Sequence, residues 1–340
     1  MKLTIGDHMN SRFAKFHTCL LGIVLGGTSV LGDDVFAQDI RFAHMNTPQH
    51  DIQKWGERLK AGVERRTNNA VKVSLFPSAQ LGENAQVTEQ ISLGADIMAQ
   101  VGPGHLVSYN PDYQILSGPF LFANWGEAER LFRSDLARSW EERMDKSNIK
   151  LLCFADFGVR NLYTAKKSVK SVADLTGMKL RVQPLPIFTE MVKAMGAAPT
   201  PMPWPEVYSA LAQGVIDAAE APPGAMLDQK HYENAKYYIL TNHVLEPLPF
   251  VVGKRTFNKM KPEHQKIFEE EARSACSWLS EQTAKSYEAG IKDIESRGVT
   301  IVRDIDRKSF IDATKVVYTK FPNWSPGLYD KVRAAIANTK

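Results

Sequence analysis

Cysteine is scarce in this chain, with 3 among 340 residues. Cys19 belongs to an early apolar run, and only Cys153 and Cys276 lie in the remaining sequence. A disulfide-rich secreted fold needs several cysteine pairs, so this composition excludes one. We expect Cys153 and Cys276 to be buried free thiols. The alternative is a bridge between them, which would need their Cα atoms within about 7 Å.

Signatures of the common enzyme classes are absent as well. The sequence has no Gly-x-Ser-x-Gly nucleophile elbow, no P-loop and no Gly-x-Gly-x-x-Gly dinucleotide motif. Its 8 histidines include no His-x-x-x-His pair, and the nearest pair after residue 37 is His44 with His50. A metal site at that pair is a weak alternative. We therefore expect no catalytic residue, no metal and no cofactor.

Charge of one sign is nowhere concentrated. The chain has 42 basic and 38 acidic residues, for a formal net charge of +4, and the two signs are interspersed. Proteins that bind nucleic acid gather basic residues on one face, so we expect no nucleic-acid partner. The composition is 44% hydrophobic and 24% charged. That is typical of a globular protein, and the length suffices for two domains with separate cores.

Long apolar runs are limited to the first 37 residues. Basic residues precede the run Cys19–Leu31, which has signal-peptide length and is too short to span a bilayer comfortably. Residues 35–37 (VFA) offer a processing site. We predict a signal peptide over residues 1–37, cleaved before Gln38, and hence export to the periplasm. The alternative is an uncleaved anchor helix.

Strand and helix patterns alternate along the next part of the chain. Residues 39–44, 71–76 and 96–101 alternate as strands, and the helical patterns 50–66 and 86–93 separate them. This order predicts a parallel sheet with helices on its faces. Ligands of such sheets bind beyond the carboxyl ends of the strands. The loops after the first and third strands should therefore form the rim of a cleft.

The whole pattern predicts an α/β fold with two lobes. We assign residues 38–155 to an N-terminal lobe, to which the C-terminal helices return, and residues 156–255 to a second lobe. Residues 149–165 would form a hinge strand, with the return crossing at 248–253. The last part, 256–340, should hold closing helices and one long helix of about 50 Å, at roughly 1.5 Å per residue, which could brace both lobes.

Arginine is the informative residue type. Arg181 lies between Leu180 and Val182 in a strand pattern suited to burial. An unpaired buried charge is costly, and a guanidinium binds a carboxylate through two parallel hydrogen bonds. We therefore predict that Arg181 binds the carboxylate of a ligand. Arg160, at the end of another strand pattern, is the second candidate. The alternative for both is a structural salt bridge or a surface position.

Several stretches then make the chain from about Asp39 onward similar to the DctP family, the solute-binding proteins of tripartite ATP-independent periplasmic (TRAP) transporters. The matching stretches are VKV at 71–73, FPSAQLG at 76–82, QISLG at 90–94, GVRN at 158–161, DLTGMKLRV at 174–182, EVYSAL at 206–211 and GVID at 214–217. The resemblance implies two α/β lobes that close on a ligand, no catalysis, and delivery to the small and large membrane subunits of an ion-driven permease.

The resemblance also implies roles for particular residues. The family's carboxylate-binding arginine falls on Arg181 and a second ligand-facing arginine on Arg160. An aromatic wall falls on Trp204, which could otherwise be a packed core residue. The N-terminal rim position falls near His50.

Two departures from the family limit the choice of substrate. Ala221 stands where many members carry a ligand-contacting asparagine, and Asn84 stands at a position that is commonly acidic. Glu220 matches a residue that holds a cation beside the ligand in some keto-acid binders, although a structural acid is the simpler interpretation. We include Asn84, Glu220 and Asp156 among the candidate ligand-binding residues.

We conclude from the sequence that the protein binds a small organic acid, which could be a sugar acid, a keto acid or a dicarboxylate. One alternative is a secreted enzyme acting on acidic sugars, with Asp156, Glu220 and His50 as its catalytic groups. Another is a sensor that presents its closed lobes to a signalling partner. We expect a monomer, and the alternative is a dimer formed through the C-terminal helices.

Overall fold

The computed structural model describes residues 38–337, so the predicted signal peptide over residues 1–37 lies outside the described residues. The described part contains a nine-stranded sheet with the strand order β2-β1-β3-β8-β4-β7-β5-β6, in which β9 also pairs with β8. Within residues 38–337, no helix has both the length and the apolar character needed to cross a membrane.

The first lobe has the predicted alternation of strands and helices. Its strands are β1 (Gln38–Ala43), β2 (Val71–Phe76) and β3 (Ile97–Gln100), and β1 pairs in parallel with the other two. Helices α1 (Asp51–Arg66) and α2 (Asn84–Leu93) connect them. In α1, Ile52, Trp55, Leu59 and Val63 are fully buried at helical spacing.

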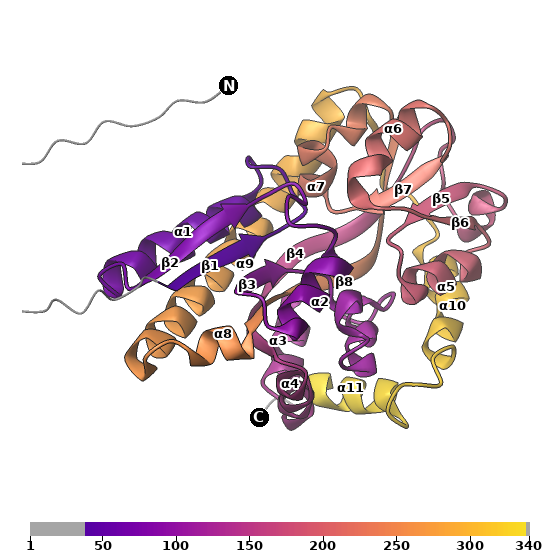
Figure 1. The fold of residues 1–340 in the computed structure, drawn as a ribbon. Coiled ribbons are helices and arrows are strands. Elements are labelled where there is room, and N and C mark those ends of the chain that lie inside the picture. Colours follow the sequence, from indigo (N-terminus) through magenta and orange to yellow (C-terminus); the bar gives the residue numbers. More distant parts are fainter. Residues whose placement is uncertain (1–37, 338–340) are drawn as a thin grey trace, which may run out of the picture. The chain divides into compact units, whose positions relative to one another are not determined.

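Two long strands pass from the first lobe into the second (Figure 1). They are β4 (Ile149–Thr164) and β8 (Tyr237–Gly253), which pair antiparallel along most of their length. The hinge strand was predicted within a residue of its bounds, but the return strand begins 11 residues before the predicted 248. The predicted lobe boundary at 155/156 falls inside β4, where the register shifts between Asp156 and Val159. The exact domain limits therefore stay a prediction.

The second lobe adds three short strands to the same sheet. They are β5 (Lys179–Val182), β6 (Ala198–Pro201) and β7 (Ala218–Ala221), with β5 parallel to both neighbours and β7 antiparallel to β4. The helices of this lobe are α5 (Pro186–Ala194), α6 (Val207–Ala212) and α7 (Pro223–Asp228). Strand β9 (Thr300–Val302) pairs with the first residues of β8.

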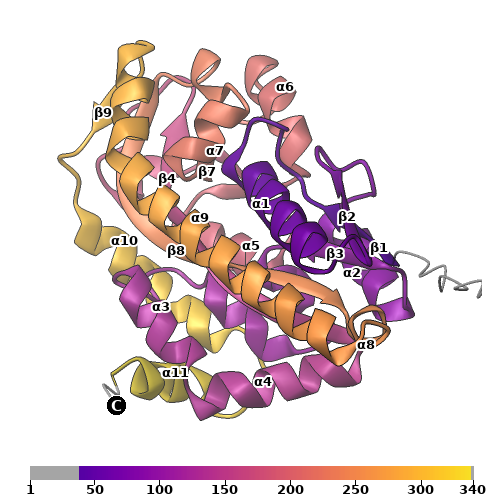
Figure 2. The same cartoon turned by 90° about the vertical axis from the view of Figure 1, so that its left-hand side faces the viewer.

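Helix α9 (Pro262–Ser296) is the predicted long helix, and it packs against elements of both lobes. Its first half buries Phe268 and Leu279 in the core formed with α1, while Ile291 and Ile294 belong to the core of the second lobe. Figure 2 shows α9 running from α8 (Lys254–Asn258) past α1 toward α7 and β9. One rigid helix thus touches both lobes.

The expectation of free thiols is wrong. Cys153 of β4 and Cys276 of α9 form a disulfide, with their Cα atoms 6.4 Å apart. The two residues are 123 positions apart in the chain, and they meet because α9 packs along β4. The bridge therefore ties the hinge strand to the long helix.

The remaining helices belong to the first lobe or follow the long helix α9 in the chain. They are α3 (Trp125–Phe132), α4 (Asp135–Lys146), α10 (Arg307–Thr314) and α11 (Leu328–Ala337). Helix α11, the last described element, packs against α3 and α4, so the end of the described part lies beside helices of the N-terminal lobe.

Candidate ligand-binding site

A cavity of about 360 Å³ is lined by residues from both lobes. Its first-lobe residues include Met45 and Asn46 just after β1, and Gly102 and Gly104 after β3. Its second-lobe residues include Gln183, just after β5. The cavity thus lies at the carboxyl ends of the parallel strands, which is where the predicted alternation places a ligand.

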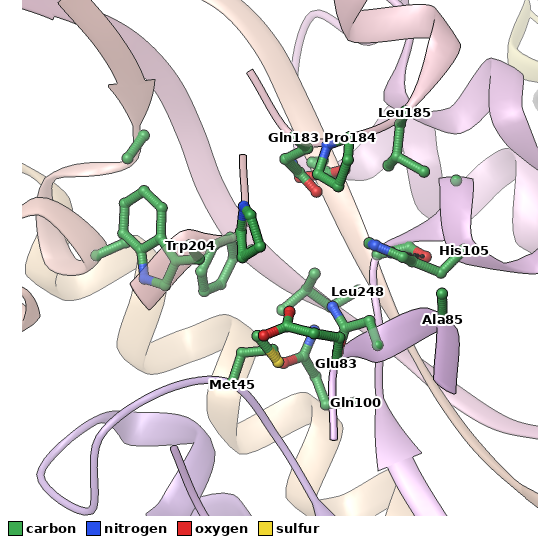
Figure 3. A pocket seen from close by; sticks show the side chains of 18 of the residues that line it. Met45, Glu83, Ala85, Gln100, His105, Gln183, Pro184, Leu185, Trp204 and Leu248 are labelled. Atoms are coloured by element: carbon green, nitrogen blue, oxygen red, sulfur yellow. Dashed lines mark hydrogen bonds between the residues drawn. The ribbon is translucent and has the colours of Figure 1, made fainter. Parts of the chain in front are cut away.

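Figure 3 shows how the cavity is enclosed. Trp204 lies on one side and His105 on the opposite side, with Gln183 and Leu185 along one edge and Gln100 across from them. Much of the lining is apolar, with a few polar side chains between. A ligand with both a carbon chain and several polar groups fits such a lining.

Arg181 lines this cavity and has no carboxylate partner among the described residues. It comes from the centre of β5 and is only 1% exposed. Its Nε and Nη2 donate to the carbonyl oxygen of Met202 at 3.1 and 2.7 Å, while Nη1 is buried without a hydrogen-bond partner. The guanidinium lies 5.2 Å from the ring centre of Trp204.

Burial lowers the pKa of Arg181 to about 10, against the opposing field of Glu220. The residue therefore remains a cation at neutral pH. A buried donor without a partner costs about 1–3 kcal/mol, and more when it is charged. An anionic group in the cavity would remove that cost.

Arg160 lines the same cavity, but its charge is already balanced. Its Nη2 donates to Glu220 Oε1 at 2.7 Å, its Nη1 donates to Glu246 Oε2 at 3.1 Å, and its Nε also bonds Glu220. Burial would raise the pKa of Glu220, yet Arg160 and His243 lower it to about 2. For Arg160 the geometry thus favours the alternative of a structural ion pair, and a direct ligand contact stays a prediction.

Glu246 of β8 is a cavity residue that the sequence analysis missed. It is 1% exposed and accepts hydrogen bonds from Ser117 Oγ at 2.9 Å and Gln183 Nε2 at 3.3 Å, besides the one from Arg160. Burial raises its pKa, and Arg160 opposes that shift. The sequence did carry a signal for this residue, because Glu246 is a single acid in the apolar run 244–253, just as Arg181 is a base between two apolar residues of β5.

Two more predicted residues line the cavity. Trp204 begins the short 3₁₀ helix Trp204–Glu206. Its ring packs edge-to-face with the His231 ring, with the two ring centres 4.7 Å apart. Asn84 is the first residue of α2. Whether either contacts a ligand stays a prediction.

Three predicted residues do not line the cavity. His50 caps α1, where its Nδ1 accepts from the Ile52 amide at 3.1 Å, and its ring packs 5.8 Å from Phe157. Asp156 accepts from the Gly158 amide at 2.8 Å where β4 changes register, and burial raises its pKa to about 6. Glu220 lies behind Arg160 and is fully buried.

These positions weaken the enzyme alternative, because none of its three proposed catalytic groups lines the cavity. They also bear on metal binding. Both oxygens of Glu220 accept from Arg160, which favours a structural acid over a cation contact. Within residues 38–337, no group of three or more histidines, cysteines or acids is arranged to hold a metal ion.

The fold and the cavity define a two-lobed solute-binding protein. The chain belongs to the bacterial extracellular solute-binding protein family 7, the DctP family, whose profile matches residues 42–323. This family consists of solute-binding proteins and is not an enzyme family.

Relatives named for their ligands, or solved with a ligand bound, match most of the chain. The 2,3-diketo-L-gulonate-binding periplasmic protein YiaO of Escherichia coli is 29% identical over 306 residues, which are 90% of this chain and 92% of YiaO. A TRAP periplasmic solute-binding protein of Actinobacillus succinogenes, solved with bound L-galactonate, is 31% identical with a TM-score of 0.84 and covers 88% of this chain and 99% of its own. A TRAP periplasmic solute-binding protein of Fusobacterium nucleatum, solved with bound sn-glycerol-3-phosphate, is 30% identical with a TM-score of 0.85. The match covers 88% of this chain and 97% of that protein.

Proposed function

We propose that this protein binds a sugar acid in the periplasm and delivers it, chemically unchanged, to the small and large membrane subunits of a TRAP permease. Membership of family 7 supports a solute-binding role outside the cytoplasm. The sugar-acid class is supported by relatives that bind L-galactonate and 2,3-diketo-L-gulonate.

Arg181 carries this proposal. Its free Nη1 and its buried, unneutralised charge call for a carboxylate in the cavity. Charge-assisted hydrogen bonds to a carboxylate are about twice as strong as neutral ones. The indole of Trp204 beside the guanidinium would cover the carbon chain that follows the carboxylate.

The neutral lining groups suit the hydroxyl groups of a sugar acid. Gln100, Gln183 and Asn46 line the cavity and offer both donors and acceptors. A simple fatty acid would leave these groups without partners, and buried polar groups without partners weaken binding.

A thermal-shift screen over aldonates, uronates, keto acids and dicarboxylates tests the ligand class, because a ligand that binds only the folded protein raises its melting temperature. Calorimetry on the best ligand then tests the site. We expect Arg181→Ala to raise the dissociation constant at least tenfold, or about 1.4 kcal/mol. Arg181→Lys should also bind more weakly, because lysine lacks the planar fork. The matched control is Arg138→Ala, an exposed arginine on α4.

Unchanged affinity in Arg181→Ala would reject the site. Turnover of a bound acid, followed by chromatography of the ligand after incubation, would favour the enzyme alternative. Uptake of the identified acid by cells that carry the permease, with and without this protein, tests the delivery step.

A further inference from the structure

We infer that Glu246 makes the site select ligands with one carboxylate and a hydroxyl group that donates to Glu246, and reject ligands with a second anionic group. This inference rests on the proposed function, in which Arg181 binds the first carboxylate. It names a second residue of the site and narrows the substrate class to sugar monoacids.

The balance of charges in the cavity is the first observation. Among residues 38–337, Arg181 and Arg160 are the only Lys or Arg side chains that line it, and Glu83 and Glu246 are the lining acids. Arg160 is shared between two carboxylates, Glu220 and Glu246, so these three residues together carry one negative charge. Burial lowers the pKa of His105 to about 4 and also lowers that of His243, so neither adds a positive charge at neutral pH. Arg181 alone is free to receive an anion.

The hydrogen bonds of Glu246 leave it room for one more donor. Arg160, Gln183 and Ser117 all donate to it, and the Arg160 guanidinium at 3.1 Å favours the carboxylate over the carboxylic acid. A carboxylate has about four acceptor positions on its two oxygens. Three are occupied here, and Glu246 lines the cavity. A ligand hydroxyl can donate to the fourth.

The backbone keeps this approach open. Gly102 lines the cavity beside Glu246, and a Cβ atom at that position would lie 3.6 Å from Glu246 Oε1 and 3.2 Å from His105 Nδ1. Any larger side chain would fill the space from which a ligand hydroxyl could reach the carboxylate. The role of Gly102 is therefore to let a ligand hydroxyl reach Glu246, and not to provide a special backbone conformation.

A second ligand carboxylate in the place of this hydroxyl would face Glu246 without a free cation among the lining residues. Like charges placed together in a buried site are strongly unfavourable, whereas a hydroxyl gains a charge-assisted hydrogen bond there. The same argument disfavours a phosphate ester whose phosphate lies beside Glu246. Replacing the terminal hydroxymethyl group of an aldonate by a carboxylate should thus be costly.

The test is calorimetry with matched pairs of acids, L-galactonate against galactarate and D-gluconate against D-glucarate, with sn-glycerol-3-phosphate as a further probe. Within each pair only the terminal group differs, hydroxymethyl in one and carboxylate in the other. We expect the wild-type protein to bind the better aldonate at least roughly a hundredfold more tightly than its dicarboxylate. In Glu246→Gln the ratio of the aldonate affinity to the dicarboxylate affinity should fall at least tenfold. The aldonate loses a charged hydrogen-bond acceptor, and the dicarboxylate loses a repulsive contact.

The control variant is Glu57→Gln, which makes the same change of charge on the exposed face of α1 and should leave the ratio unchanged. If Glu246→Gln does not fold, the ratio of aldonate to dicarboxylate affinity in the wild-type protein still tests the inference. Because sn-glycerol-3-phosphate has a single anionic group, which Arg181 can receive, its binding tests only the Arg181 site. A dicarboxylate bound as tightly as the aldonate would overturn the inference. If that binding is still lost in Arg181→Ala, the proposed carboxylate site survives. If no acid of any pair binds, both proposals fail.

Discussion

Two buried arginines line one cavity, and their surroundings are opposite. Arg160 on the hinge strand β4 shares two carboxylates, while Arg181 on β5 bonds only a backbone carbonyl. The first is part of an internal ion-pair cluster, and the second is left with a donor unused. The difference supports the proposal that Arg160 has a structural role and that Arg181 binds the ligand.

The acids near the hinge differ in the same way. Arg160 holds the pKa of Glu220 at about 2, whereas Asp156, four residues before Arg160, has among residues 38–337 only the Gly158 amide as a donor to its side chain. Burial therefore raises the pKa of Asp156 to about 6. Whether a buried charge stabilises or destabilises this fold depends on its counter-charge, and the following predictions test that view.

The largest effect is expected for Arg160→Leu. This change leaves Glu220 and Glu246 buried without a cation, and breaking a buried ion pair typically costs about 3–5 kcal/mol. Denaturant unfolding of the unliganded protein measures the loss. An unfolding free energy within 1 kcal/mol of wild type, on the order of normal surface changes, would mean that Arg160 is not structural.

The disulfide on the same strand comes next. Removing it as Cys153→Ala with Cys276→Ala should lower the unfolding free energy by about 2–4 kcal/mol, because the bridge closes a long loop in the unfolded chain. Denaturant unfolding of the double variant, compared with wild type with its bridge intact, checks this. Equal stability would show that packing of α9 on β4 suffices without the bond.

Asp156 should give a pH-dependent effect. Its folded-state pKa lies above the ordinary value of about 3.9, so the folded protein binds the proton more tightly than the unfolded chain does. Its contribution to stability is present below about pH 4 and is lost as the pH rises through about 6. The stability of Asp156→Asn relative to wild type should therefore increase over that window. Parallel unfolding profiles for the two proteins would contradict the prediction.

The smallest change in stability is expected for Arg181→Leu. Removing an unneutralised buried charge removes its desolvation cost but leaves the Met202 carbonyl without its donors, so the unliganded protein should stay within about 1 kcal/mol of wild type. The measurement is the same denaturant titration as for Arg160→Leu. A loss of unfolding free energy as large as that expected for Arg160→Leu would show that the two arginines do not differ in their structural role.

Much of the site was predictable because a single charge in an apolar strand is a local signal. Arg181 stood out for that reason, and Glu246 offered the same signal in the run 244–253. The pairing of Arg160 was not predictable, because its partners lie 60 and 86 residues farther along the chain. His50 stays a predicted rim residue that does not line the cavity. Its position in the loop before α1 suggested the rim, but its ring caps the helix.

The sequence by itself determined the order of strands and helices, the long helix and the family, since all of these depend on periodicity and motifs within short segments. The tertiary structure decided which charges are neutralised and that Cys153 meets Cys276. Those outcomes depend on contacts between segments far apart in the chain. The same residue type can therefore be a structural partner in β4 and an unpaired charge in β5, and only the packing of the two lobes distinguishes them.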